Sequence, residues 1–148
     1  MKKFWAINFV LLSVFIADRI IKYYFYKNPV IIFGGDFFYD QLSFHFAKNY
    51  GVAFGLPISS SFLLGLIFFI LIFLVSLLHT QIVKKNYALV FSITLIIIGA
   101  FSNLIDRIKY GFVIDYIDLN WFTIFNLADC LITLGVFSFL YFSYIKKD

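Results

Sequence analysis

Long apolar runs alternate with polar segments along the chain, and this alternation predicts its secondary structure. The runs cover residues of about 4–26, 60–78, 87–105 and 121–144. A helix rises about 1.5 Å per residue, so a run of about 20 residues matches a hydrocarbon core of about 30 Å. We therefore predict an all-α membrane protein with four transmembrane helices, folded as a single domain over residues 1–148.

Between the first two runs, residues 27–58 show a different pattern. Short β-prone runs at Val30–Phe33, Phe37–Tyr39 and Leu42–Phe46 are separated by the turn signals Asn28-Pro29 and Gly34-Gly35. The last run alternates apolar and polar residues, as a half-buried strand does. The pattern predicts a small β-rich extracytoplasmic region between the first and second helices.

The composition supports insertion into a membrane. Of the residues, 63% are apolar and 14% are charged, and the mean hydropathy is +0.96. Soluble domains are only about 45–50% apolar. The first run follows two lysines, as a signal peptide would, but charged residues follow it in place of a small-residue cleavage site, so we expect a retained span.

The net charge of +4 indicates topology. Most lysines flank the apolar runs, so we expect no nucleic-acid partner. Six lysines fall on the side of the two termini and three fall in the outer loops, and the positive-inside rule therefore places both termini in the cytoplasm. The six are Lys2, Lys3, Lys84, Lys85, Lys146 and Lys147, and the three are Lys27, Lys48 and Lys109.

Polar side chains within or beside the predicted helices fall near one face, the outer one. Ionisable groups in a membrane are costly and point to a functional site. Asp18 and Lys22 are four residues apart and share a helix face, which favours an ion pair with either a structural or a chemical role. The full set is Asp18, Lys22, Asn49, Asn103, Asp106, Arg107, Asp115, Asn126 and Asp129.

The sequence contains no pattern that indicates a metal site or an activated nucleophile. The two histidines, His45 and His79, fall on opposite sides of the predicted membrane, so we expect no metal site and no Ser/His or Cys/His pair. The single cysteine, Cys130, cannot form an intrachain disulfide, and we expect a buried apolar side chain there.

The carboxylates remain as the candidate catalytic groups. Two aspartates held close together share a proton, so that one acts as a general acid and the other as a general base. Such a dyad hydrolyses an amide bond without a cofactor. Asp129 is one partner, and position alone leaves Asp106, Asp115 and Asp118 open as the other.

Five short motifs occur in order over the whole chain. They are Asp18 with Lys22, Asn49-Tyr50-Gly51-Val52-Ala53-Phe54-Gly55, Asn103-Leu104-Ile105-Asp106-Arg107, Val113-Ile114-Asp115 and Phe125-Asn126-Leu127-Ala128-Asp129. With four predicted spans, these motifs resemble those of the bacterial lipoprotein signal peptidases, also called signal peptidase II.

The resemblance implies roles for these residues. It assigns the catalytic dyad to Asp115 and Asp129 and leaves Asp106 to support Arg107. It implies that the remaining motif residues position the substrate backbone or the dyad: Asn49, Gly51, Asn103, Arg107, Asn126 and Ala128. Two departures affect packing: Ile21 stands where the family often has Ser, and Phe101-Ser102 replaces a more glycine-rich run.

The resemblance also implies a substrate and a location. The substrate is a prolipoprotein that carries diacylglyceryl-cysteine, cut on the amino side of that cysteine, and we expect no cofactor. We expect a monomer in contact with the lipids of the bacterial inner membrane, with its site near the extracytoplasmic face. The loops at 27–58 and 108–120 are candidate lids because they lie beside the motifs.

Two other classes of function remain as alternatives. A small proton-coupled transporter would use intramembrane carboxylates, but the ionisable residues gather at one face and do not line a path across the bilayer. A non-catalytic scaffold would use polar residues to hold helices together, but it has no use for Asn and Asp side chains that repeatedly face one volume.

Overall fold

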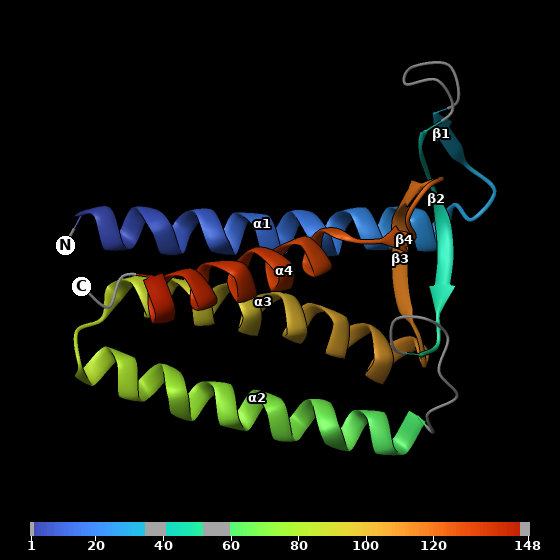
Figure 1. Ribbon diagram of the computed structural model, residues 1–148. Helices are drawn as coiled ribbons and strands as arrows, with labels where there is room; N and C mark the ends of the chain where they lie inside the picture. Colours follow the sequence, from blue (N-terminus) through green and yellow to red (C-terminus); the bar gives the residue numbers. More distant parts are fainter. Residues whose placement is uncertain (1, 35–40, 52–59, 146–148) are drawn as a thin grey trace.

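The structure is a computed structural model that describes residues 2–34, 41–51 and 60–145. Four helices run side by side in the described part of the chain, and a small sheet stands across one end of them (Figure 1). The helices are α1 (Lys2–Lys27), α2 (Ser60–Val83), α3 (Tyr87–Tyr110) and α4 (Leu127–Leu140), and α4 continues into a π-helical turn at Tyr141–Ile145.

These helices confirm that each of the four apolar runs contains a helix. Among the described residues, three stretches are long and apolar enough to cross a membrane: Ser61–Val83, Tyr87–Tyr110 and Leu127–Tyr144. Large apolar side chains such as Phe69 and Ile72 lie on the outside of the bundle, each 69% exposed, where lipid covers them. The chain is a multi-pass membrane protein, and a crossing by α1 stays a prediction.

The predicted start of the fourth helix at Trp121 is wrong. The helix begins at Leu127, because Asn126 has an extended backbone (φ −134°, ψ 175°) and its side chain accepts a hydrogen bond from the Asp129 amide. This is the geometry of an N-cap. Ile124–Phe125 pairs as a strand, so the apolar residues before the cap belong to the sheet.

The sheet has four antiparallel strands in the order β1-β2-β3-β4. β1 (Ile32–Gly34) and β2 (Leu42–Asn49) confirm the prediction of strands between the first two helices, while the predicted run at Phe37–Tyr39 lies outside the described residues. β3 (Val113–Leu119) and β4 (Ile124–Phe125) come from between α3 and α4. The prediction that the β-rich region lies only between the first two helices is therefore wrong in part, because two of the four strands lie between α3 and α4.

The sheet brings two distant segments to the ends of the helices. β2 pairs with β3 so that Ala47 faces Asp115 and Asn49 faces Val113. β3 follows α3 directly because Gly111 ends that helix with φ 80°, a left-handed conformation that glycine adopts without strain. Residues 108–120 were expected to form a loop that could act as a lid. Most of this segment is instead β3, a paired and largely buried strand.

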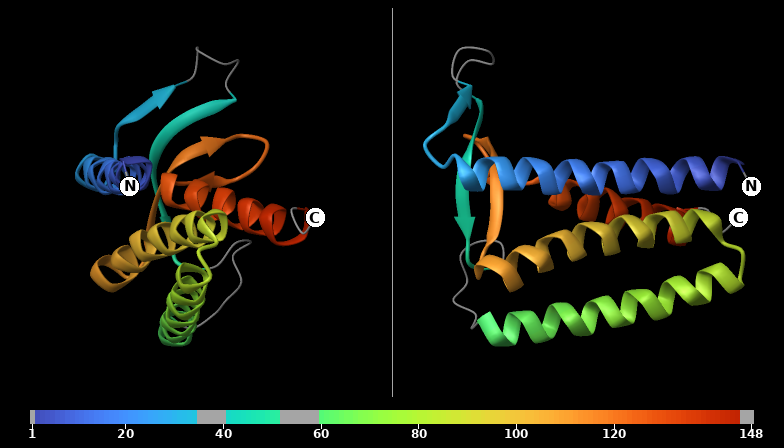
Figure 2. Two further views of the ribbon diagram at one scale, coloured as in Figure 1. Left: turned by 90° about the vertical axis from the view of Figure 1, so that its left-hand side faces the viewer. Right: turned by 180° about the vertical axis from the view of Figure 1, so that it is seen from behind.

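Close packing of α3 against α4 fixes the depth of the last helix. α3 contacts all three other helices, as the two views in Figure 2 show. A Cβ at Gly99 would overlap the Ala128 carbonyl and the side chain of Ile132, and a Cβ at Gly135 would overlap Ile96. The absence of these Cβ atoms lets the two backbones approach, which places the first turn of α4 beside the polar residues of α3.

Candidate active site

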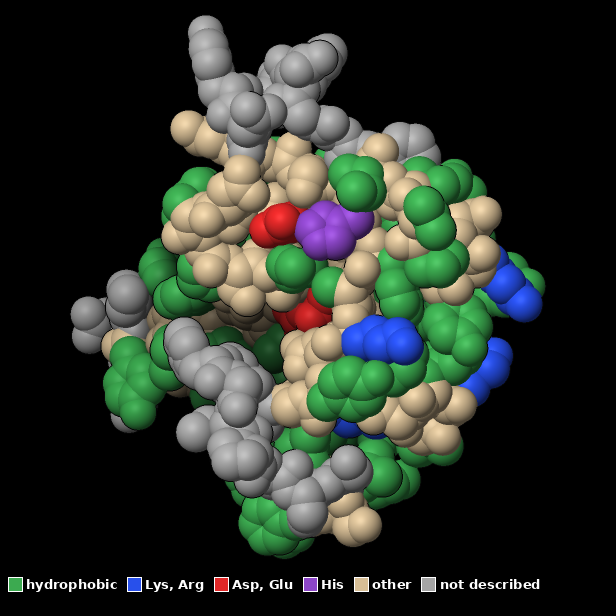
Figure 3. Space-filling view, turned by 90° about the vertical axis from the view of Figure 1, so that its right-hand side faces the viewer, with side chains coloured by type: hydrophobic (Ala, Val, Ile, Leu, Met, Phe, Trp, Pro, Cys, Tyr) green, Lys and Arg blue, Asp and Glu red, His purple; other side chains and the backbone are tan. Residues whose placement is uncertain are grey.

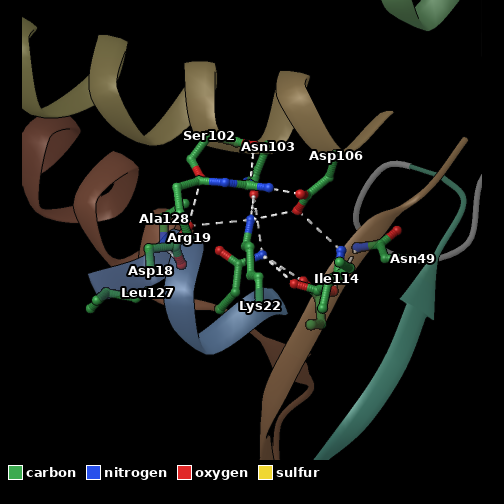
Figure 4. A network of polar contacts seen from close by, with 12 residues as sticks. Asp18, Arg19, Lys22, Asn49, Ser102, Asn103, Asp106, Ile114, Leu127 and Ala128 are labelled. Carbon is green, nitrogen blue, oxygen red and sulfur yellow. Dashed lines mark hydrogen bonds and ion pairs between the residues drawn. The ribbon is translucent and has the colours of Figure 1, made fainter. Parts of the chain in front are cut away.

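The polar residues predicted to share one site converge where the helices meet the sheet, and Figure 4 shows five of them: Asp18, Lys22, Asn49, Asn103 and Asp106. Five elements supply them. α1 contributes Asp18 and Lys22, α3 contributes Asn103, Asp106 and Arg107, β2 and β3 contribute Asn49 and Asp115, and Asn126 and Asp129 stand at the start of α4. Six of these side chains are buried, so their charges and dipoles act in a medium of low dielectric constant.

Asn126 links the two aspartates that the resemblance assigned as the dyad. Its Nδ2 donates to Asp115 Oδ1 at 2.6 Å, and its backbone N–H donates to Asp129 Oδ2 at 3.1 Å. Its Oδ1 in turn accepts from the Asp129 amide at 2.9 Å. The two contacts with Asp129 form a capping box, so one residue ends the strand region, starts α4 and holds both carboxylates.

Two further asparagines each donate to one member of the pair. Asn49 Nδ2 donates to Asp115 Oδ2 at 3.0 Å, and Asn103 Nδ2 donates to Asp129 Oδ1 at 2.8 Å. Each aspartate therefore accepts bonds on both oxygens. These bonds favour ionised carboxylates and fix their orientation from β2, α3 and α4.

Asp115 nevertheless has a raised pKa. Burial is the largest cause and the negative charge of Asp129 is the second, and together they outweigh the bonds from Asn49 and Asn126, so the pKa of Asp115 rises from 3.8 to about 6. A carboxyl group of this pKa exchanges a proton near neutral pH, as a general acid or base must.

Lys22 lies at the centre of a buried ion network. Its ammonium group has no exposed surface, and it lies 2.8 Å from Asp106 Oδ2 and 3.5 Å from Asp18 Oδ2. It also donates to Asn103 Oδ1 at 2.7 Å, which turns the Asn103 amide group toward Asp129. The predicted Asp18–Lys22 pair is confirmed, and Lys22 is connected to Asp129 through Asn103.

Arg19 completes this network, although the sequence pattern did not single it out. Its Nη1 donates to Asp106 Oδ1 at 2.6 Å and to the backbone and side-chain oxygens of Ser102. Two cations thus balance the two anions Asp18 and Asp106. The sequence did show Arg19 as a third charged residue within the first apolar run. Its partners could not be predicted from spacing, because they lie more than 80 residues away in the sequence.

Tyr116 is a second residue that sequence reasoning missed. Its hydroxyl donates to Asp18 Oδ1 at 3.2 Å and accepts from the Leu127 amide at 3.1 Å, and Asp18 Oδ1 also accepts from the Ala128 amide. Burial raises the pKa of Tyr116 well above its ordinary range, so it stays a neutral donor. Asp18 and Tyr116 thereby satisfy the free amides of Ala128 and Leu127, the two residues that precede Asp129 in the first turn of α4.

Arg107 contacts the segment that follows β2 and not its expected partner. The resemblance implied that Asp106 supports Arg107, but the Asp106 carboxylate contacts Arg19 and Lys22 and accepts from the Ile114 amide. Arg107 Nη2 instead donates to the Gly51 carbonyl at 3.0 Å. Within the described residues, its buried Nε has no hydrogen-bond partner. The rest of the motif after Gly51 lies outside the described residues.

Asp118 lies outside the dyad, on the sheet. Its Oδ2 is 3.9 Å from Nδ1 of His45, and acidic and histidine side chains lie next to each other on the sheet end of the molecule (Figure 3).

Cys130 is only half-buried, so the expectation of a buried side chain is wrong. The described part of the chain holds no group of three or more potential metal ligands.

Comparisons with known proteins cover almost the whole chain. The family model of signal peptidase (SPase) II matches residues 10–145. A lipoprotein signal peptidase of Bartonella henselae is 40% identical over 88% of this chain and 85% of that protein, and one of Syntrophomonas wolfei is 38% identical over 90% and 87%. A solved bacterial membrane enzyme has a TM-score of 0.76 and 28% identity over 97% of this chain and 94% of that chain.

Proposed function

The chain belongs to the signal peptidase II family, and from this membership and the geometry of the site we propose that it is a membrane-embedded aspartic endopeptidase. It removes the signal peptide from prolipoproteins that carry diacylglyceryl-cysteine and cuts on the amino side of that cysteine. It acts as a monomer in the bacterial inner membrane, with both termini in the cytoplasm and the dyad near the extracytoplasmic face.

The link through Asn126 is the observation that carries this proposal. One side chain and its own backbone amide contact both Asp115 and Asp129. Asp106 is engaged by two cations and Asp118 lies beside His45. Of the three carboxylates that position alone left open, only Asp115 shares a partner with Asp129 among the described contacts.

The dyad holds one proton in the resting enzyme, and we place it on Asp115. Burial and the neighbouring charge of Asp129 raise the pKa of Asp115 to about 6, which favours the proton on Asp115. Asp129 then takes a proton from water while the oxygen of that water bonds to the scissile carbonyl carbon, and Asp115 protonates the carbonyl oxygen. When the C–N bond breaks, the cysteine nitrogen receives a proton from the dyad.

The peptide backbone is held by the groups beside the dyad. Arg107 fixes the Gly51 carbonyl, and its Nε is a buried donor without a partner in the described part of the chain. We assign this donor to a substrate carbonyl, because a buried guanidinium N–H is costly to leave unpaired. The lipid tails of the substrate remain in the bilayer beside the helices.

The decisive experiment uses purified protein with diacylglyceryl-modified and unmodified precursors of the same lipoprotein. Asp115→Asn and Asp129→Asn should fold and insert but release no signal peptide. Asp118→Asn is the matched control, because it removes a carboxylate from the same strand as Asp115 and should cleave normally. Equal cleavage of both precursors would contradict the lipid requirement, and near-normal cleavage by either dyad variant would contradict the assigned mechanism.

A further inference from the structure

The turn between β3 and β4 presents two large aromatic side chains to the outside. Trp121 is 71% exposed and Phe122 is 69% exposed. The rings of Trp121 and Phe122 are 6.0 Å apart, and that of Phe122 is 6.3 Å from Phe125. A protein in water rarely exposes adjacent large apolar side chains without a partner for them.

The turn lies to the side of the helices and not above them. In the view along the helices (Figure 2, left), the β3–β4 hairpin extends beyond their outline, on the side of α4. The turn is held in shape, because the Phe122 amide donates to Leu119 O at 2.8 Å and the Asn120 amide donates to Gln41 O at 3.2 Å. Whatever surrounds the bundle at this level therefore meets the aromatic pair.

The residues at the level of the turn are those of a membrane boundary in composition. The last turns of α1 and α3 lie at the same end as the sheet, and they carry Tyr23, Tyr26 and Tyr110. Lys27 lies over the ring of Tyr23 and Lys109 lies over that of Tyr110. Tyrosine with lysine at helix ends is typical of the interface between hydrocarbon and headgroups.

We propose that Trp121 and Phe122 form an anchor that seats the β3–β4 hairpin in the headgroup layer of the bilayer and so sets the depth of the active site. The partner is the lipid surface itself, whose boundary favours aromatic rings. β3 contains Asp115, and Phe125 directly precedes Asn126, which holds both aspartates. The anchor and the dyad are therefore parts of one short, hydrogen-bonded segment.

Fluorescence tests the contact without any need for catalysis. The sequence has two tryptophans, so Trp5→Phe leaves Trp121 as the single reporter. In vesicles of phosphatidylcholine brominated near the carbonyl end of the acyl chains, the emission should be quenched and should resist acrylamide. Strong quenching by acrylamide with no effect of the brominated lipid would overturn the proposal.

Cleavage tests the consequence for the site, and this part rests on the proposed function. The double variant Trp121→Ser/Phe122→Ser should cleave lipidated precursor about tenfold more slowly in vesicles, because loss of buried apolar area weakens interfacial seating. In micelles, where detergent adapts to the protein, its rate should match the wild type. Tyr87→Ser is the control, because Tyr87 is 66% exposed at the opposite end of α3.

The outcomes separate the two proposals. Equal losses in vesicles and micelles, or an equal loss in Tyr87→Ser, would overturn the anchor. An inactive wild-type protein whose Trp121 is quenched by the brominated lipid would contradict the proposed function and leave the anchor standing.

Discussion

Replacing Asn49 by alanine should move the pH profile of the enzyme in a defined direction. Asn49 Nδ2 donates to Asp115 Oδ2 at 3.0 Å, and this bond lowers the pKa of Asp115. A hydrogen bond to a charged group contributes about 1.5–3 kcal/mol. Asn49 is half-buried, so we take the lower end of this free-energy range. It corresponds to a change of about one unit in the pKa of Asp115.

The sign follows from the form that the bond stabilises. Asn49 favours the ionised carboxylate, so Asn49→Ala should raise the pKa of Asp115 from about 6 to about 7. In the proposed mechanism the dyad is inactive once Asp115 loses its proton. The alkaline limb of kcat/KM, which reports the free enzyme, should therefore move up by about one unit.

The assay measures initial cleavage of a diacylglyceryl-modified lipopeptide between about pH 4.5 and 9, a range that includes the expected limbs of both proteins. Asn28→Ala is the control, because Asn28 caps the end of α1 through the Tyr24 carbonyl and lies outside the site. A rate that is lower by the same factor at every pH would mean that Asn49 positions the substrate, because such a loss does not move the alkaline limb. A limb that stays in place or moves to lower pH would refute the assigned role of the Asn49 bond.

Three further predictions concern stability, each measured by thermal unfolding in detergent. Gly99→Ala should destabilise by about 1–3 kcal/mol and slow cleavage, because its Cβ overlaps the start of α4, whereas the Cβ of Gly65→Ala meets nothing within 4 Å and this variant should not destabilise. Lys22→Met should cost about 3–5 kcal/mol because it leaves buried anions uncompensated, whereas Lys27→Met at the exposed end of α1 should be tolerated. Asp115→Asn should stabilise at pH 8 but not at pH 4, because the raised pKa of about 6 means that ionisation above this pH disfavours the fold; a gain at pH 4 alone would contradict it.

The helices and the composition of the site follow from the sequence. Hydrophobic length alone predicts helices, because the hydrocarbon core fixes how many apolar residues a span requires. Spacing predicts the Asp18–Lys22 pair, because residues four apart share a helix face, and the structure places the two charged groups 3.5 Å apart. The motifs identified the family, and the comparisons confirm it.

The hydrophobic pattern predicted the wrong structure where strand pairing determined it. The apolar residues from Trp121 to Phe125 continue the hydrophobicity of the last span, but Ile124–Phe125 pairs with β3 and Asn126 caps the helix. Strand pairing depends on a partner elsewhere in the chain, and the hydropathy of a segment carries no information about that partner.

Position along the chain fixed the depth of each polar group, while tertiary contacts fixed its partner. Asp106 binds Arg19 and Lys22 and not its neighbour Arg107, and Tyr116 meets Asp18 across 98 residues. The sequence by itself therefore determined a membrane protein whose motif aspartates gather at one end of its helices. The packing of β3 and the α4 cap decided which of them meet Asn126, because a hydrogen bond of 2.6 Å depends on where folded elements cross and not on their order in the chain.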